Sequence, residues 1–247
     1  MTVLTDIELL SKRARLKAAR AEAGFFDHPA RESIIGAIDH TLLSPASTPA
    51  EIAIHCDEAV KFGFASVCIP MTSVPEAYRV LKGSNVKVGT LAAFPLGTTP
   101  VSIKSAEISW ALEHGADEVD VVLDLSAIRG GEKQHVRDEL FSLREAASGA
   151  VLKVILEMPL LDDSQAINTL RLAEQAGVDF VKTCTGFSGA VTFYQVALLR
   201  TAASDSMKIK AEGGIKTYAA AEILKALGAD RIGTSMASDL LIVNRES

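Results

Sequence analysis

Cysteine is scarce in this sequence, which has three such residues among 247. Cys56, Cys68 and Cys184 form no C-x-x-C pair and no even-numbered set, so a fold held together by a disulfide framework is excluded. Reduced thiols are usual in the cytoplasm, and we therefore expect a cytoplasmic protein.

Several other signals are missing. No apolar run is long enough to span a membrane, and residues 1–8 carry acidic side chains instead of the apolar stretch of a secretory leader. The formal net charge is −6 and no long basic run occurs, which argues against nucleic acid as a partner. The five histidines are scattered, with no pair at a helical ligand spacing, so we expect neither a metal nor another cofactor.

The sequence does contain a quasi-repeat. Four times, an amphipathic stretch ends at a glycine and is followed by a short, largely apolar run. The glycine suits the left-handed position after a helix, and the run suits a parallel strand that is covered on both faces. The four runs are residues 64–69, 116–122, 178–182 and 229–233.

Four further strand candidates alternate with these runs, at residues 34–39, 86–94, 151–157 and 207–212. Eight strands with helical patterns between them predict an α/β fold of the (β/α)8 TIM barrel type. An open, doubly wound sheet is the alternative, but the G-x-G-x-x-G loop expected after its first strand is absent. Cap residues before proline or acid predict helix starts at residues 47–51, 98–100 and 162–165 and at Thr217.

Residues 1–30 are typical of a polar helical extension, which Thr5 can cap. We therefore divide the chain into an N-terminal helical extension, residues 1–30, and a single barrel domain, residues 31–247. The extension has a partial apolar stripe, made of Leu9, Leu10, Leu16 and Ala19.

The predicted strands carry charges that a buried strand would normally exclude. Because side chains alternate along a strand, several of these charges share a face that can point to the barrel axis. The sets are Asp120 with Asp124, Lys153 with Glu157, and Lys208 with Lys210 and Glu212. For Lys153, Glu157 and Lys208, buried salt bridges between strands are as good an explanation as a functional role.

Lys182 and Lys210 are different, because they lie on neighbouring strands and each is close to a glycine-containing strand end. Mutual repulsion and burial would both lower the pKa of a lysine in this position. A lysine with a lowered pKa can attack a carbonyl carbon and form an imine. Asp120, one or two strands away, could then move protons directly or through water.

Eight segments, in order and at family-like spacing, resemble those of the deoxyribose-phosphate aldolase family. They are residues 38–43 (IDHTLL), 67–70 (VCIP), 93–97 (AFPLG), 117–122 (DEVDVV), 153–157 (KVILE), 179–183 (DFVKT), 213–215 (GGI) and 231–235 (RIGTS). The resemblance covers essentially everything from residue 34 to residue 241. It implies a (β/α)8 barrel and a metal-free, reversible aldol reaction, in which 2-deoxy-D-ribose 5-phosphate is cleaved to acetaldehyde and D-glyceraldehyde 3-phosphate.

The resemblance also implies roles for single residues. Lys182 falls on the imine-forming position, Lys210 on the second lysine that tunes it, and Asp120 on the acid/base of the proton relay. Asp39 falls on the acid that pairs with the second lysine. The implied substrate-binding residues, of which the glycines and Ser235 form a phosphate site and Lys216 a nearby cation, are Thr41, Cys68, Thr185, Gly186, Gly213, Gly214, Lys216, Gly233 and Ser235.

Four residues depart from the family pattern near the implied site. Cys184 stands where serine is usual, Glu212 where a small residue is usual, and Met158 where threonine is usual. Met236 replaces a serine of the phosphate site, and methionine has no hydroxyl to donate. Glu212 could hold either lysine charged or recognise a polar group of the substrate. These four residues are candidate determinants of specificity.

Four functions remain open. The first is the deoxyribose-phosphate aldolase reaction, and the second is the same imine chemistry on another, possibly unphosphorylated, aldehyde. The third is a non-catalytic barrel that binds a sugar phosphate, and the fourth is an isomerase that needs no nucleophilic lysine. In each case the partner is a small molecule, and we expect a homo-oligomer with the N-terminal extension as a contact surface.

Overall fold

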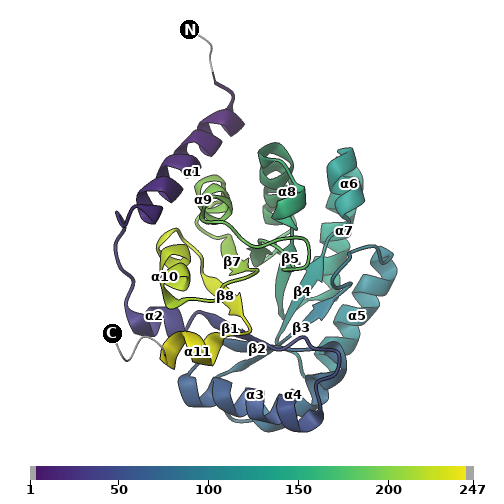
Figure 1. Cartoon of the computed structure of the whole chain (residues 1–247). Coiled ribbons are helices and arrows are strands. Elements are labelled where there is room, and N and C mark those ends of the chain that lie inside the picture. The colour runs from purple at the N-terminus through teal and green to yellow at the C-terminus, as the bar shows by residue number, and fades with distance from the viewer. Residues whose placement is uncertain (1–3, 243–247) are drawn as a thin grey trace.

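A computed structural model describes residues 4–242 of the chain. Eight parallel strands close into a barrel in chain order, with β1 paired to β8, and the helices surround it (Figure 1). The predicted (β/α)8 TIM barrel is confirmed. The strands are β1 (Ile38–Thr41), β2 (Ser66–Cys68), β3 (Lys87–Ala92), β4 (Glu118–Val122), β5 (Val151–Ile155), β6 (Phe180–Lys182), β7 (Lys208–Glu212) and β8 (Arg231–Thr234).

The α-helices and two short 3₁₀ helices occupy the connections between strands. They are α1 (Asp6–Glu22), α2 (Arg31–Ile35), α3 (Pro49–Phe62), η1 (Met71–Ser73), α4 (Val74–Leu81), α5 (Val101–Glu113), α6 (Leu125–Gly130), α7 (Lys133–Ala146), η2 (Met158–Leu160), α8 (Asp163–Gln175), α9 (Phe193–Ala202), α10 (Tyr218–Ala226) and α11 (Ala237–Ile242). No helix among residues 4–242 combines the length and the apolar character that crossing a membrane requires.

The alternation of side chains along each strand divides the interior into two environments. Outward-facing residues such as Val119, Val121 and Val154 are fully buried against the helices and form the main hydrophobic core. Their neighbours Glu118 and Asp120 on β4 are buried as well, but on the opposite face, toward the barrel axis. The apolar layer thus supplies the core, and the axis is left for charged groups.

Local signals placed most helix boundaries correctly. Thr48 caps α3 through a reciprocal capping box with Glu51, and Asp162 caps α8 in the same way with Gln165. Thr217 accepts a hydrogen bond from the N–H of Ala220 at the start of α10. α5 begins after Pro100 without a side-chain cap.

The first strand was predicted too early. Residues 31–35 form the short helix α2, and β1 begins only at Ile38. A second correction concerns Asp124, which lies beyond β4 and caps α6 by accepting hydrogen bonds from the N–H groups of Ser126 and Ala127. Asp124 therefore does not share a strand face with Asp120.

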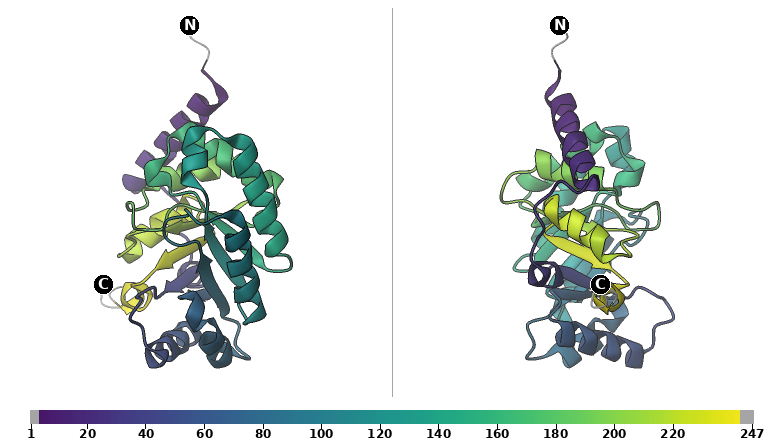
Figure 2. Two further views of the ribbon diagram at one scale, coloured as in Figure 1. Left: turned by 90° about the vertical axis from the view of Figure 1, so that its right-hand side faces the viewer. Right: turned by 60° about the vertical axis from the view of Figure 1, so that its left-hand side comes forward.

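The N-terminal helix α1 lies outside the barrel's helical layer and packs most extensively against α9 (Figure 2). Its predicted apolar stripe is confirmed at Leu10, which is partly buried against the core, but is wrong at Leu9, Leu16 and Ala19, which are exposed. The buried face consists of small side chains, which let the helix approach its neighbours closely. These are Ser11, Ala14, Ala18 and Ala21.

Two histidines pack together behind β1. The rings of His40 and His55 stack with centroids 3.5 Å apart, and the Nε2 of His55 hydrogen-bonds to the main-chain oxygen of His40. Burial, reinforced by the neighbouring His40, lowers the pKa of His55 to about 4. An unfolded histidine titrates near pH 6.5, so between these values the unfolded chain binds a proton that the folded chain does not.

Stability is therefore expected to fall as the pH is lowered from about 6.5 toward 4. Glutamine at position 55 can still donate to the carbonyl of His40 but does not titrate. His55→Gln should remove about 2 kcal/mol of the fall in unfolding free energy, measured by urea denaturation at pH 7 and at pH 4.5. The control is His28→Gln, on a side chain that is 66% exposed. An unchanged pH dependence in His55→Gln would contradict this assignment.

Candidate active site

The strands bring the side chains of the predicted catalytic residues together on the barrel axis. Lys182 on β6 is paired with Lys210 on β7, and Asp120 on β4 is paired with Lys153 on β5. Asp39 projects from β1, across the axis. All five side chains are buried, with at most 1% of their surface exposed.

Asp120 is the centre of this group. Its Oδ2 accepts hydrogen bonds from the Nζ of Lys182 at 3.0 Å and of Lys210 at 2.8 Å, and its Oδ1 accepts one from Lys153 at 3.0 Å. Burial raises the pKa of Asp120, but the three ammonium groups outweigh this and hold it well below its usual value. Asp120 is therefore an ionised carboxylate that links both lysines.

Two further carboxylates contact the lysines. The Oδ2 of Asp39 lies 2.7 Å from the Nζ of Lys210, so the predicted pair is present. The Oε2 of Glu212 lies 2.9 Å from the Nζ of Lys182 and 3.2 Å from that of Lys210. Glu212 thus joins the network directly, in contact with both lysines.

The prediction that the pKa values of Lys182 and Lys210 are lowered is wrong for the protein without substrate. Burial does lower the pKa of Lys182, and Lys210 repels its charge, but Glu212 and Asp120 outweigh both and raise the pKa above its usual value. The pKa of Lys210 is raised well above normal by Asp120, Asp39 and Glu212, against the effect of burial. In the free protein both lysines are ammonium groups.

A second set of charges, deeper in the barrel, supports the first. Lys153 also contacts Glu118, at 2.6 Å, and Arg231 bridges Glu118 and Asp39. Ser66 donates a hydrogen bond to Asp39 at 2.7 Å. Lys153 is accordingly part of a buried salt-bridge network between strands, which was one of the two explanations that the sequence left open for it. Sequence reasoning missed Glu118, Arg231 and Ser66, although Glu118 is two residues from Asp120 and so on its face of β4.

A pocket of about 350 Å³ opens at the C-terminal ends of the strands. Glu212 is part of its wall, together with Leu43, Ser44, Phe187, Ile215 and Thr234. Eight of the nine predicted substrate-binding residues also line it: Thr41, Thr185, Gly186, Gly213, Gly214, Lys216, Gly233 and Ser235. This is the end of a TIM barrel at which active sites are found.

Cys68, the ninth, is not in the pocket wall. It is buried at the end of β2, in a small apolar cluster that contains Leu91, Val122 and Ile155. Burial raises the pKa of the Cys68 thiol to about 12. The structure therefore places Cys68 beneath the site, as a neutral thiol.

Glu157 holds one side of the pocket in place. It follows β5 with φ 54° and ψ 53°, a left-handed conformation that costs a residue other than glycine about 1–3 kcal/mol. Its carboxylate accepts a hydrogen bond from the hydroxyl of Thr185, and that hydroxyl accepts one from the N–H of Phe187. Glu157 thereby fixes the loop that carries Thr185, Gly186 and Phe187.

Of the four departures from the family pattern, Glu212 alone reaches the pocket wall. Cys184 is buried behind it and donates its thiol to the main-chain oxygen of Glu212, at 2.8 Å. Met158 is buried under the strand ends, with its N–H bonded to the oxygen of Thr183. Met236 is 37% exposed beside the pocket. Of the four, Glu212 is therefore the one placed to contact a molecule bound in the pocket.

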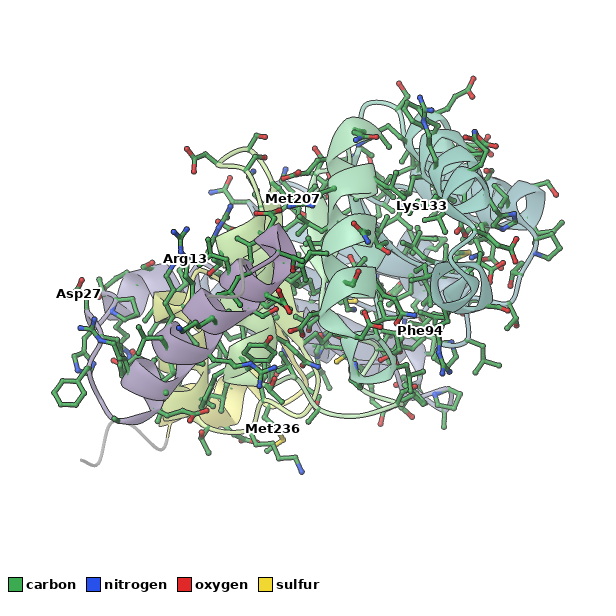
Figure 3. The ribbon with its side chains drawn as sticks, turned by 90° about the horizontal axis from the view of Figure 1, so that it is seen from above. Arg13, Asp27, Phe94, Lys133, Met207 and Met236 are labelled. Atoms are coloured by element: carbon green, nitrogen blue, oxygen red, sulfur yellow. The ribbon has the colours of Figure 1, made fainter. Side chains whose placement is uncertain are left out.

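The mouth of the site is partly apolar. Phe94, after β3, makes an edge-to-face contact with Phe187 at 5.5 Å, and its ring lies 6.0 Å from the Nζ of Lys182. Figure 3 shows Phe94 and Met236 toward one side of the molecule, and Met207, which precedes β7, toward the other. The pocket thus has a polar wall of loop backbone and an aromatic margin.

One group of potential metal ligands occurs among residues 4–242: His40, His55 and Glu58, with ligand atoms within 4.8 Å of one another. A histidine binds a metal in the plane of its ring, and the stacked rings of His40 and His55 cannot both direct a nitrogen at one ion as they stand. The Nε2 of His40 instead contacts Glu58 at 3.1 Å. This arrangement does not fit a metal centre.

The family model described as DeoC/LacD family aldolase matches residues 33–236. The chain belongs to this family of aldolases. The deoxyribose-phosphate aldolase of Carboxydothermus hydrogenoformans is 42% identical to it over 203 residues, which are 80% of this chain and 89% of that protein.

Solved structures agree with this relationship. A candidate deoxyribose-phosphate aldolase from Coccidioides immitis superposes on this aldolase with a TM-score of 0.86 at 30% identity, covering 99% of this chain and 100% of that one. A deoxyribose phosphate aldolase from Aeropyrum pernix, described as a unique tetramer, gives a TM-score of 0.78 at 30% identity and covers 96% and 97%. This aldolase is therefore a lyase built on the barrel of its family.

Proposed function

We propose that this aldolase cleaves 2-deoxy-D-ribose 5-phosphate reversibly to acetaldehyde and D-glyceraldehyde 3-phosphate, through an imine on Lys182. One observation carries the proposal. A buried lysine, which shares the carboxylate of Asp120 with a second lysine, lies directly behind a pocket whose wall includes the backbone of four glycines. Such backbone can bind a phosphate without a net positive charge.

The residues would share the reaction as follows. Lys182, once neutral, attacks the aldehyde carbon and loses water to form an iminium ion. The iminium ion accepts the electron pair of the carbon–carbon bond as it breaks, and Asp120 exchanges the proton of the substrate hydroxyl. Lys210 holds Asp120 and Asp39 in place and balances their charge. No step requires a metal or another cofactor.

Phosphate recognition is the part that needs a direct test. Retro-aldol cleavage should be measured with deoxyribose 5-phosphate and with deoxyribose, by release of acetaldehyde. We expect a preference for the phosphorylated sugar, and a preference for deoxyribose would refute the substrate assignment. Glu212 is the residue that favours the second candidate, an unphosphorylated aldehyde, because it adds a carboxylate to the pocket wall.

Reduction with borohydride in the presence of acetaldehyde tests the imine itself. An adduct located on Lys182 by mass spectrometry is the expected result, because the imine carbon is reduced to a stable amine. Absence of any adduct would instead favour a barrel that binds a sugar phosphate without catalysis.

Asp120→Asn separates imine formation from turnover. We expect this variant to give the borohydride adduct on Lys182 but to turn over about 10²- to 10⁴-fold more slowly, the usual contribution of a general acid or base. The comparison needs the rate of acetaldehyde release and the extent of trapping on the same preparation, with thermal unfolding as a check on folding. Turnover at the parent rate would remove Asp120 from the proton relay.

We also propose a homo-oligomer that acts in the cytoplasm. Leu16 on α1 is 64% exposed and Phe25, just after it, 70% exposed, so the extension presents apolar side chains on its outer side. The buried, unpaired thiols of the chain fit a reducing compartment. Light scattering of the parent and of a Leu16→Glu, Phe25→Glu variant measures the assembly. A smaller mass for the variant is expected, and a monomeric parent would contradict this proposal.

A further inference from the structure

Glu212 occupies a position between the pocket and the lysines. Glu212 lines the pocket, whereas Lys182 and Lys210 do not. Its Oε2 nevertheless lies 2.9 Å and 3.2 Å from their ammonium nitrogens. Among residues 4–242, it is the one charged member of the lysine network that also faces the pocket.

The position of Glu212 is fixed by its surroundings. Its N–H donates to the Oγ1 of Thr183 at 3.1 Å, and its main-chain oxygen accepts from that hydroxyl at 2.9 Å and from the Cys184 thiol at 2.8 Å. A side chain at position 233 would collide with the Glu212 carboxylate, so the glycine there makes room for it. Cys184 therefore helps to hold the backbone of Glu212, and Gly233 leaves the space that the Glu212 carboxylate occupies.

The two carboxylates that touch Lys182 differ in how they are bound. Both oxygens of Asp120 accept well-directed hydrogen bonds from ammonium groups. The Oε2 of Glu212 is buried and close to both lysines but accepts no hydrogen bond of proper geometry. Of the two carboxylates, Glu212 is therefore the one whose oxygen lies beside Lys182 without being held by a directed hydrogen bond.

The same pocket offers a place for an anion next to Glu212. The main-chain N–H groups of Gly214 and Ser235, both in the pocket wall, have no acceptor among residues 4–242. Lys216 contributes a cation to that wall. Free N–H groups at the ends of strands together with a cation suit a phosphate dianion, the group that the substrate under Proposed function carries.

We propose that an anion bound in this part of the pocket drives the proton of Lys182 onto Glu212 and so produces the neutral amine. The N–H bond of the ammonium group breaks, its electron pair stays on Nζ, and an O–H bond forms at Oε2. The transfer moves the proton from Lys182, which lies behind the pocket wall, to Glu212, which lines the pocket. The proton thus comes closer to the bound dianion. A nearby negative charge therefore favours the transfer.

The acid formed on Glu212 has a further use. After the amine has added to the aldehyde, the carbinolamine must lose its hydroxyl group as water. Glu212 can supply that proton, which yields the iminium ion and restores the carboxylate. In the sum, ammonium and aldehyde give iminium and water, so no outside acid or base is consumed.

Without an anion, the surrounding charges keep the pair ionised. The groups that face Lys182 and Glu212 from the neighbouring strands are Asp39 on β1, Cys68 on β2, Asp120 on β4 and Lys210 on β7. The raised pKa of Lys182 in the free protein agrees with this state. This inference rests on the proposed function, because it assumes that Lys182 is the nucleophile.

Phosphite dianion and acetaldehyde test the coupling, because acetaldehyde carries no phosphate of its own. The rate at which borohydride fixes the adduct on Lys182 is measured at pH 7 with and without phosphite. We expect phosphite to accelerate trapping about tenfold in the parent, the effect of about one pKa unit on the fraction of neutral amine, and to leave the rate of Glu212→Gln unchanged. The matched control is Glu222→Gln, on α10, which should keep the full acceleration.

Each outcome decides a separate question. Trapping that phosphite does not accelerate in the parent, or accelerates equally in Glu212→Gln, would overturn the coupling. No adduct on Lys182 under any condition would instead overturn the proposed function. Gly233→Ala is the second variant, in case Glu212→Gln does not fold: the methyl group should displace the Glu212 carboxylate and abolish the acceleration, and an acceleration equal to the parent's would again overturn the coupling.

Discussion

Lys182→Leu is expected to lower the rate of cleavage by at least about 10⁴-fold and to abolish the borohydride adduct. The leucine side chain has no nitrogen to form an imine, so the covalent route is lost entirely. Acetaldehyde release under saturating substrate and intact-mass analysis after reduction are the two measurements. The variant should still fold, because Lys153 and Lys210 continue to pair with Asp120.

The same variant distinguishes the aldolase from the isomerase considered at the outset. An isomerase on this barrel would need an acid and a base but no nucleophilic lysine, so its activity would survive the change. Sugar phosphate conversion without cleavage, undiminished in Lys182→Leu, would therefore contradict the role given to this residue.

Lys210→Leu is expected to reduce turnover near neutral pH by about 10²- to 10³-fold. Lys210 neutralises Asp39, Asp120 and Glu212, which lie 2.7, 2.8 and 3.2 Å from its Nζ. Without that cation, the carboxylates hold the proton of Lys182 more strongly, and its pKa rises further above its usual value. One unit of pKa is about a tenfold change in neutral amine, and the misplacement of Asp120 adds to the loss.

The pH–rate profile is the decisive measurement for Lys210→Leu. Its rising limb should move to higher pH, so part of the lost rate should return in alkaline buffer. Lys208→Leu is the control, since Lys208 is on the same strand but exposed at its start. A profile that coincides with the parent's would show that the pair of lysines does not act as described.

The barrel itself could be predicted because its signals are local. The glycines that end the helices do adopt left-handed conformations, as Gly63 with φ 74° and Gly177 with φ 72° illustrate. The errors lie where tertiary packing decides. Ile34 and Ile35 were predicted to begin the first strand because they are apolar, but they end α2 instead. On α1, the small side chains of Ser11, Ala14, Ala18 and Ala21 form the fully buried face, whereas Leu9 and Leu16 are exposed.

The sequence predicted which residues make up the site, but not the direction in which the pKa values of its two lysines are shifted. Spacing along the strands placed Lys182 and Lys210 on neighbouring strands, and the prediction of lowered pKa values rested on their mutual repulsion and burial. The distances of Asp120 and Glu212 from these lysines depend on how the strands are staggered, and these carboxylates reverse the direction of the pKa shift. Glu212 was predicted to hold either lysine charged, and the structure shows it in contact with both.

The charges along the barrel axis balance. Four cations, Lys153, Lys182, Lys210 and Arg231, are in contact with four carboxylates, Asp39, Glu118, Asp120 and Glu212. Each member contacts at least two groups of opposite charge, so the loss of one weakens the network without leaving any other member unpaired. Each single substitution of a charged member by a neutral residue still shifts the net charge of the axis by one. Replacing a cation together with one of its carboxylates keeps the axis neutral, so a library that varies these positions in pairs reaches neutral combinations that single substitutions do not.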